Sequence, residues 1–409
     1  MSLRIRIGLP VLLVSWLIAA GCDLGTFMGA DDPSSADRCT ELLKKPAQDS
    51  RPASVTVLLA DGSASAFARP QPTKRADWGA DLTEHLPGNG GDLIAVGVFG
   101  GAVDWQTEVL TPAKSRDAQR TRIDLGDARK CLTNDLTATM TTIPSKPQTD
   151  VLRALAEGAE YVRKWPGPKA IYLATDGLSN TGCADLRAAS IGDTSEIASI
   201  IKGCAPELPK LDPSYTVSFI GLGNSSAGWT DIKTPQRTWI ASLWKALCDA
   251  TTATCEAPDS AKPSIFDTPG AKPGADNDVT MPTITVAQKN PTIVTVPSSL
   301  LFDVDKYVLA PGRSQDALQE VYKTLGQLHP KRIEVDGHTD STGTPEHNQT
   351  LSEKRAATVA VKLRAQHFTG ITSKGYASDR PRCTPEYRNG KPDRIAMACN
   401  RRVEILVYI

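Results

Sequence analysis

The chain has 409 residues, of which 40% are hydrophobic and 22% charged, and its 46 basic residues balance its 46 acidic ones. This length is sufficient for two domains that each bury a core. A formal net charge of zero argues against a nucleic-acid partner, because nucleic-acid-binding proteins normally carry a basic excess.

The first 22 residues have the pattern of an export signal. Arg4 and Arg6 precede an apolar run of about fifteen residues, which is short for a membrane span and typical of a signal-peptide core. The run ends in AAGC (19–22), which resembles a bacterial lipobox, although Ala19 stands where Leu is usual. The resemblance implies a lipid on Cys22 and an exported, membrane-anchored protein that faces the periplasm or cell wall. An ordinary signal peptide or an uncleaved anchor is the alternative.

Eight further cysteines follow Cys22. An even number in an exported chain predicts disulfides. We expect two local pairs, Cys383 with Cys399 and Cys248 with Cys255, while free buried thiols remain the alternative. The cysteines and histidines form no tight cluster in the sequence, so we do not expect a zinc site.

Residues 23–52 are polar and predict a tether, and residues 53–256 predict a domain. Near-continuous apolar runs, typical of parallel strands that are buried on both faces, occupy 54–60, 92–99, 169–174 and 216–222. Helical patterns lie between and after them, at 149–165, 195–202 and 235–250. Alternating strands and helices predict an α/β fold with a doubly wound parallel sheet.

Polar residues follow two of these strands. Asp61, Ser63 and Ser65 come directly after the first strand, Asp176 follows the third, and Thr149 opens the helix between them. Ligands of such folds bind beyond the carboxyl ends of the strands. Hydroxyl and carboxylate oxygens suit a hard cation such as Mg²⁺. The alternative is that these residues form turns and cap helices.

The same spaced set resembles the metal-ion-dependent adhesion site of the von Willebrand factor A domain. That motif is D-x-S-x-S, then a distant Thr and a distant Asp, and the five residues above match it in order. The resemblance implies Mg²⁺ or another divalent cation whose shell is completed by an acidic side chain of a protein partner. Such a site serves adhesion rather than catalysis.

Residues 257–290 contain prolines at 258, 263, 269, 273 and 282 among small polar residues. This composition predicts a semi-extended linker without a core of its own. A last domain, 291–409, follows it.

Residues 333–359 carry the clearest pattern of the last domain. A short strand places Ile333 and Val335 on one face, and a helix is predicted with Thr344 as N-cap and Pro345 as first residue. The helix should bury one side, namely Ala356, Val359, Ala360 and Leu363. The carboxylate of Asp340 and the guanidinium of Arg355 could bind the two ends of a zwitterion.

These residues resemble the OmpA-like peptidoglycan-binding domain. The matching positions are Thr339, Asp340, Gly343, Asn348, Leu351, Ser352, Arg355 and Ala356. The resemblance extends to an opening strand at 300–312, which contains Asp303, and to a closing strand at 400–407. It implies a smaller α+β domain that binds the diaminopimelate of a peptidoglycan stem, with Asp340 and Arg355 as charge partners, Asn348 supporting the loop, and Thr339 and Asp303 as further binding residues. The alternative is a surface ion pair between Asp340 and Arg355.

Together these features predict a non-catalytic envelope lipoprotein that binds peptidoglycan with one domain and an unidentified protein with the other. A sensor or assembly factor that couples the two binding events is the first alternative. A cell-wall-acting serine enzyme is the second, since Ser199 and Lys202 form a Ser-x-x-Lys pair. The other motifs of such enzymes are absent from the sequence, so we expect no catalysis.

Overall fold

The computed structural model describes residues 33–47, 50–66, 74–142, 146–224, 232–258, 262–267 and 279–409. The predicted export signal, with Cys22, and the first part of the predicted tether lie outside these residues. Within the described ranges, every helix is too short or too polar to span a membrane.

The N-terminal domain is built on a six-stranded sheet with the order β4-β3-β1-β5-β6-β7. Its strands are β1 (Val55–Asp61), β3 (Leu93–Phe99), β4 (Val103–Leu110), β5 (Lys169–Ala174), β6 (Tyr215–Ile220) and β7 (Thr254–Cys255). All four predicted strands are present. The sheet is mixed rather than parallel, because β4 runs antiparallel to β3. The connection of residues 100–102 is too short for a crossover, so these two strands can only form a hairpin.

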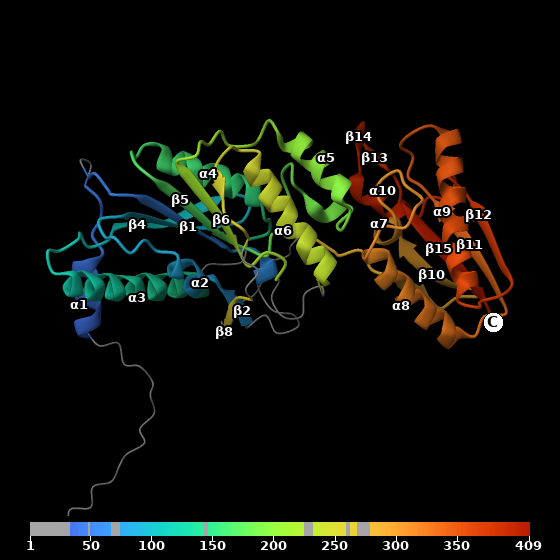
Figure 1. Cartoon of the computed structure of the whole chain (residues 1–409), viewed down its shortest axis with the longest axis horizontal. Helices are drawn as coiled ribbons and strands as arrows, with labels where there is room; N and C mark the ends of the chain where they lie inside the picture. Colours follow the sequence, from blue (N-terminus) through green and yellow to red (C-terminus); the bar gives the residue numbers. More distant parts are fainter. Residues whose placement is uncertain are drawn as a thin grey trace, which may run out of the picture.

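Helices cover both faces of this sheet (Figure 1). Alternate residues of β1 enter different cores, with Val57 and Leu59 on one side and Leu58 and Ala60 on the other. One face carries the predicted helices α4 (Val151–Arg163), α5 (Thr194–Cys204) and α6 (Thr234–Asp249), and the other carries α2 (Trp78–Glu84) and α3 (Ala118–Thr142). Short 3₁₀ turns η1 (Ala64–Ala66) and η2 (Leu186–Ala188) follow the ends of β1 and β5. The architecture is α/β.

The predicted tether contains ordered structure. Residues Pro33–Leu42 form helix α1, and a disulfide joins Cys39 to Cys131 of α3. The guanidinium of Arg38 lies 2.6 Å from the Asp124 carboxylate of α3. Polar composition predicted an extended segment, but α1 is held by contacts with residues far along the chain. Helix α1 is therefore attached to the N-terminal domain.

Both predicted disulfides are present, Cys248–Cys255 and Cys383–Cys399. The structure adds Cys183–Cys204 to the Cys39–Cys131 pair. All four bridges join cysteines that are consecutive in the sequence, and the two added pairs lie 21 and 92 residues apart.

The described part of the predicted linker is bonded to both domains. Strand β8 (Ser264–Asp267) pairs with β2 (Lys74–Asp77), and β9 (Thr285–Ala287) pairs with the first long strand of the C-terminal domain. Val279 and Met281 are buried in the N-terminal core. This corrects the prediction of a free spacer, because backbone hydrogen bonds and buried apolar side chains hold the segment.

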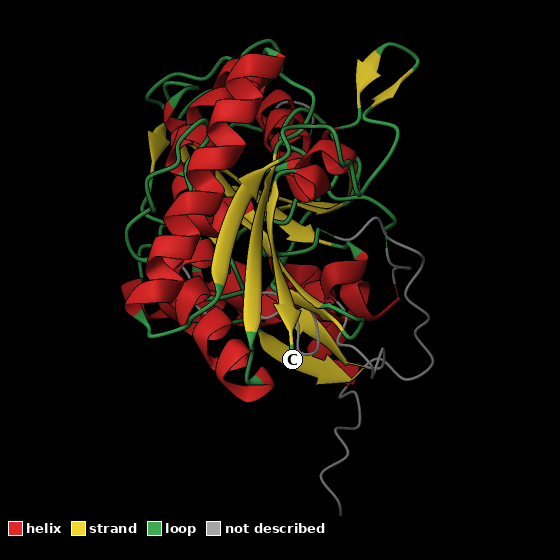
Figure 2. Cartoon of the chain, turned by 90° about the vertical axis from the view of Figure 1, so that its right-hand side faces the viewer, coloured by secondary structure: helices red, strands yellow, loops and turns green. Residues whose placement is uncertain are grey.

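The C-terminal domain has a five-stranded sheet with the order β12-β11-β15-β10-β9. Figure 2 shows these strands in the foreground beside the helices. The further strands are β10 (Thr292–Pro297), β11 (Arg332–His338), β12 (Ile371–Gly375) and β15 (Arg402–Tyr408). Helices α8 (Arg313–Leu328) and α9 (Pro345–Ala365) bury their apolar sides against one face of the sheet. A small hairpin, β13 (Tyr387–Arg388) and β14 (Lys391–Pro392), precedes α10 (Arg394–Asn400).

The segment predicted as the opening strand, 300–312, is not a strand. It contains the end of α7 (Ser298–Leu301) and a loop closed by a single bridge between Phe302 and Leu309. Asp305 has a φ of 59°, a left-handed conformation that no strand accommodates. The closing strand begins at Arg402 rather than at 400, because α10 extends to Asn400.

The beginning of α9 is as predicted. Thr344 is the N-cap, and its hydroxyl accepts a hydrogen bond of 3.2 Å from the backbone N–H of His347. Pro345 is the first helical residue. The predicted buried side of the helix is fully buried, at Ala356, Val359, Ala360 and Leu363.

The two domains are in contact (Figure 1). Helix α10 of the C-terminal domain packs near η2 of the N-terminal domain. The Asp193 carboxylate accepts a hydrogen bond of 2.5 Å from the backbone N–H of Val304, and the Arg313 guanidinium donates one of 2.6 Å to the Gly192 carbonyl. The two domains therefore contact each other directly, in addition to being joined by the linker segment.

Candidate ligand-binding site

A cavity of about 620 Å³ lies where the two domains meet. The C-terminal domain contributes all the residues predicted to bind peptidoglycan: Asp303, Thr339, Asp340, Asn348 and Arg355. The N-terminal domain contributes Ala188, Ser190, Asp193 and Glu196. The structure thus brings the predicted residues together, and their part in binding stays a prediction.

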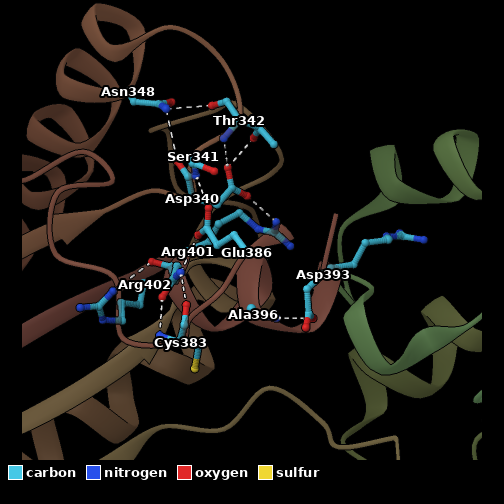
Figure 3. A network of polar contacts seen from close by, with 12 residues as sticks. Asp340, Ser341, Thr342, Asn348, Cys383, Glu386, Asp393, Ala396, Arg401 and Arg402 are labelled. Carbon is cyan, nitrogen blue, oxygen red and sulfur yellow. Dashed lines mark hydrogen bonds and ion pairs between the residues drawn. The ribbon is translucent and has the colours of Figure 1, made fainter. Parts of the chain in front are cut away.

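Asp340 lies in the loop that follows β11 and is only 4% exposed. One carboxylate oxygen accepts hydrogen bonds from the backbone N–H, at 3.0 Å, and the hydroxyl of Thr342. The other oxygen lies 2.6 Å from a guanidinium nitrogen of Arg401 (Figure 3). The alternative that Asp340 simply pairs with Arg355 is therefore not what the structure shows.

Arg355 lies on α9 and is also 4% exposed. Its guanidinium donates to the carbonyls of Lys306, at 2.8 Å, and Asp303, at 3.3 Å. Burial and the neighbouring charge of Arg401 lower the pKa of Arg355 to about 10, so it is cationic at neutral pH. Within the part of the chain that the structure describes, no carboxylate forms an ion pair with it. Arg355 is thus suited to receive a carboxylate from a ligand.

Asn348 connects the Asp340 loop to α9. Its side-chain amide donates to the backbone carbonyls of Asp340, at 3.2 Å, and Thr342, at 2.8 Å (Figure 3). Gly343 completes the turn with a φ of +90°, which favours glycine. These contacts fix the loop that carries Asp340.

Two further cavity residues, Arg394 and Arg401, were not identified from the sequence. Arg394 begins α10 and pairs with Glu196 at 3.1 Å, and Arg401 pairs with Asp340. The available signal was the pair Arg401-Arg402 at the start of the closing strand. Only Arg401 lines the cavity. The guanidinium of Arg402 instead forms an ion pair with the Glu404 carboxylate, with 2.7 Å between nitrogen and oxygen.

The five residues predicted to bind a metal are buried at the carboxyl ends of β1 and β5 and just before α4. The Asp61 carboxylate accepts from the Ser63 backbone N–H, at 2.9 Å, and from the Thr175 hydroxyl, at 2.6 Å. The hydroxyls of Ser63 and Ser65 lie 2.8 Å apart. The Asp176 carboxylate accepts from the backbone N–H of Leu178. These contacts join the ends of the two strands.

The Thr149 hydroxyl is the strongest sign that this set could bind a ligand. It is buried, and among the described residues no hydrogen-bond partner reaches it. The set offers two carboxylates and three hydroxyls, and the described ranges hold no cluster of three or more His, Cys, Asp or Glu suited to a metal. Burial raises the pKa of Asp61, and hydrogen bonds from Ser63 and Thr175 oppose this rise more than the positive charge of Arg75 does. The oxygen donors fit a hard cation, whose binding requires Asp61 to be ionised.

Ser199 and Lys202 are exposed on α5. Neither is among the residues that line the cavity. Their spacing on one helix accounts for their proximity, and no described neighbour organises them into a site.

Comparison with known proteins defines the class of the C-terminal domain. Residues 301–385 match the OmpA family. Over 120 residues, the chain is 36% identical to outer membrane protein A of Salmonella typhi, covering 28% of this chain and 34% of that protein. It is also 36% identical over 120 residues to outer membrane protein A of Atlantibacter hermannii, covering 28% and 49%. The chain thus spans less than two thirds of either relative.

Among solved structures, the cell wall anchor of the T6SS from Pseudomonas aeruginosa aligns with 27% identity and a TM-score of 0.26, covering 31% of this chain and 87% of that one. The family match confirms that the C-terminal domain is OmpA-like. The likeness of the N-terminal domain to the von Willebrand factor A domain stays a prediction.

Proposed function

We propose that this chain is a non-catalytic cell-envelope lipoprotein that binds peptidoglycan through its OmpA-like domain. The observation that carries the proposal is the buried cation of Arg355, which has no ion-pair partner among the described residues and faces the cavity with Asp340. The OmpA-like match and the Salmonella and Atlantibacter outer membrane proteins support an envelope location.

Diaminopimelate fits this arrangement, because its side chain ends in an ammonium and a carboxylate on one carbon. The planar guanidinium of Arg355 can bind the carboxylate through two parallel hydrogen bonds. Asp340 can accept the ammonium, although it already pairs with Arg401. Because the ammonium must share Asp340 with Arg401, we expect Arg355 to contribute more of the affinity.

Substitution of Arg355 tests the proposal. Arg355→Gln keeps a polar side chain but removes the charge, so binding to purified peptidoglycan in a pull-down should fall at least about tenfold. Arg364→Gln, an exposed residue of the same helix, is the matched control and should bind normally. Circular dichroism melting establishes that both variants are folded. Wild-type retention of peptidoglycan by folded Arg355→Gln would refute the proposal.

We further propose that the N-terminal domain binds Mg²⁺ or another divalent cation through Asp61, Ser63, Ser65, Thr149 and Asp176. A protein partner would complete the cation's shell with an acidic side chain, and a lipid on Cys22 would hold the chain at a membrane. The unpartnered Thr149 hydroxyl supports the cation site.

A sensor or assembly factor that couples the two binding events is a second candidate function. The cavity favours it, because both domains line it. No observation favours catalysis by the exposed Ser199 and Lys202.

A further inference from the structure

We infer that the cavity is a composite site in which the N-terminal domain supplies Glu196 as a specificity-determining residue. The inference rests on the proposed function of this cavity. Glu196 would restrict the ligand to peptidoglycan stem peptides that bring one free carboxylate into the cavity.

The segment that carries Glu196 is bonded to both domains. Asp193 is the N-cap of α5, and its backbone carbonyl accepts a hydrogen bond of 2.6 Å from the Trp239 indole of α6. The Asp193 carboxylate accepts a hydrogen bond from the backbone N–H of Val304, and the Arg313 guanidinium donates one to the Gly192 carbonyl. The first turn of α5 is therefore held against the C-terminal domain, and this contact keeps Glu196 at the cavity wall.

Glu196 forms an ion pair with one of the cationic side chains of the cavity. Its side chain is 13% exposed and lies 3.1 Å from Arg394. Burial raises the pKa of Glu196, whereas the charges of Arg394 and Arg401 lower it. Two of the guanidinium groups that line the cavity are thus paired with the chain's own carboxylates, Arg394 with Glu196 and Arg401 with Asp340.

This charge distribution determines which ligands are accepted. A first ligand carboxylate can bind Arg355 without displacing a protein carboxylate. A second one would have to displace Glu196 or Asp340, and it would otherwise meet like charge in a partly desolvated space. Stem peptides whose second carboxylate is amidated avoid this conflict. Since Glu196 belongs to the other domain, the preference depends on the contact between the domains.

Calorimetric titration of the full chain tests the inference with two probes. One is the stem tripeptide L-alanyl-γ-D-glutamyl-diaminopimelate. The other is the same peptide with two carboxylates amidated, that of the glutamyl residue and that on the peptide-linked carbon of diaminopimelate, so that only the carboxylate beside the free ammonium remains. The wild type should bind the amidated peptide about two- to fivefold more tightly, the range expected for a partly exposed ion pair. Glu196→Gln should remove the preference by tightening binding of the free acid. When Arg394→Gln is already present, Glu196→Gln should change the preference between the two peptides less, because Glu196 acts through Arg394.

Glu320→Gln is the control, because it breaks a second ion pair between the described parts of the two domains, Lys233–Glu320, at residues that do not line the cavity. It should keep the preference. An unchanged preference in Glu196→Gln, or an equal change in Glu320→Gln, would overturn the inference while binding that depends on Arg355 still supported the proposed function. A wild type that binds neither peptide nor purified peptidoglycan would overturn both.

Discussion

Arg355 and Asp340 show how far individual residues can be predicted here. Their place in one cavity agrees with the sequence motif, because a loop followed by a capped helix sets their relative position through local geometry. The ion pairs that the structure forms in this cavity could not be predicted. Arg401 reaches Asp340 across 61 residues of sequence, and Glu196 reaches Arg394 across 198. Such pairs depend on how distant elements pack.

His338, the last residue of β11, is a buried histidine whose protonation should destabilise the fold. It is 2% exposed, its ring stacks on Tyr376, and among the described residues neither ring nitrogen has a hydrogen-bond partner. Burial lowers the pKa of His338 to about 4, and the charge of Arg402 acts in the same direction. Burial shifts the pKa of neighbouring Asp336 in the other direction and raises it to about 6.

We predict a pH-dependent effect of His338→Gln. The unfolded histidine has a pKa of about 6.5 and the folded one about 4, so the wild type loses stability as pH falls between these values. The variant lacks this loss, and Asp336 contributes equally to both proteins. When the pH falls from 7 to 4, the local free energy of unfolding of the wild type should therefore decrease by about 2–3 kcal/mol more than that of the variant. Hydrogen exchange of the β11 amides measures this, and a stability difference that is independent of pH would contradict it.

At the scale of elements, apolar runs predicted the buried strands well, while polar elements were missed. Strand β4 buries only two of its eight residues, and α3 buries only a narrow set of side chains, which includes Leu132 and Leu136. Neither shows a continuous apolar pattern. In contrast, Asp61 and Asp176 follow β1 and β5 as predicted, because parallel strands end at the same edge of a sheet.

Thr149→Val tests the cation site at this edge. Valine has nearly the same shape, and the Thr149 hydroxyl has no described hydrogen-bond partner. Without a cation, the variant should be as stable as the wild type or more stable by up to about 1 kcal/mol. The response of tryptophan fluorescence to Mg²⁺ should be lost, because one oxygen ligand is removed. Six of the seven tryptophans lie between residues 50 and 256, so fluorescence reports on this domain.

Thr133→Val, on α3 at the opposite face of the sheet, should keep the Mg²⁺ response. If the fluorescence of Thr149→Val responded to Mg²⁺ like that of the wild type, the Thr149 hydroxyl would not be a cation ligand. A wild type without any response to Mg²⁺ or Mn²⁺ would remove the cation from the proposed function.

For the whole molecule, the contact between the domains is the main departure from the sequence prediction. The described linker residues pair with strands of both domains, and a cavity forms at the contact. Arg313 is central to this contact. Its side chain is 11% exposed and donates to Gly192 of the N-terminal domain, and to Ser299 and Asp303 of its own.

We predict that Arg313→Gln weakens the contact between the domains by about 1.5–3 kcal/mol, the usual contribution of one hydrogen bond from a charged group, here to the Gly192 carbonyl. Small-angle X-ray scattering should then show a larger radius of gyration than that of the wild type. Glu320→Gln, which removes an exposed pair at the same contact, should leave the scattering unchanged. Identical scattering for Arg313→Gln and the wild type would argue against a central role for Arg313.

The sequence by itself determined the strands β1, β3, β5 and β6, the start of α9 at Thr344, and the grouping of Asp340 with Arg355. Burial patterns, helix caps and short loops depend on neighbouring residues, so they can be read locally. Only the tertiary structure decided that α1 joins the N-terminal domain, that Arg401 pairs with Asp340, and that Glu196 lines the cavity between the domains. These features arise from contacts between residues far apart in the chain, whose free energies depend on packing rather than on local pattern.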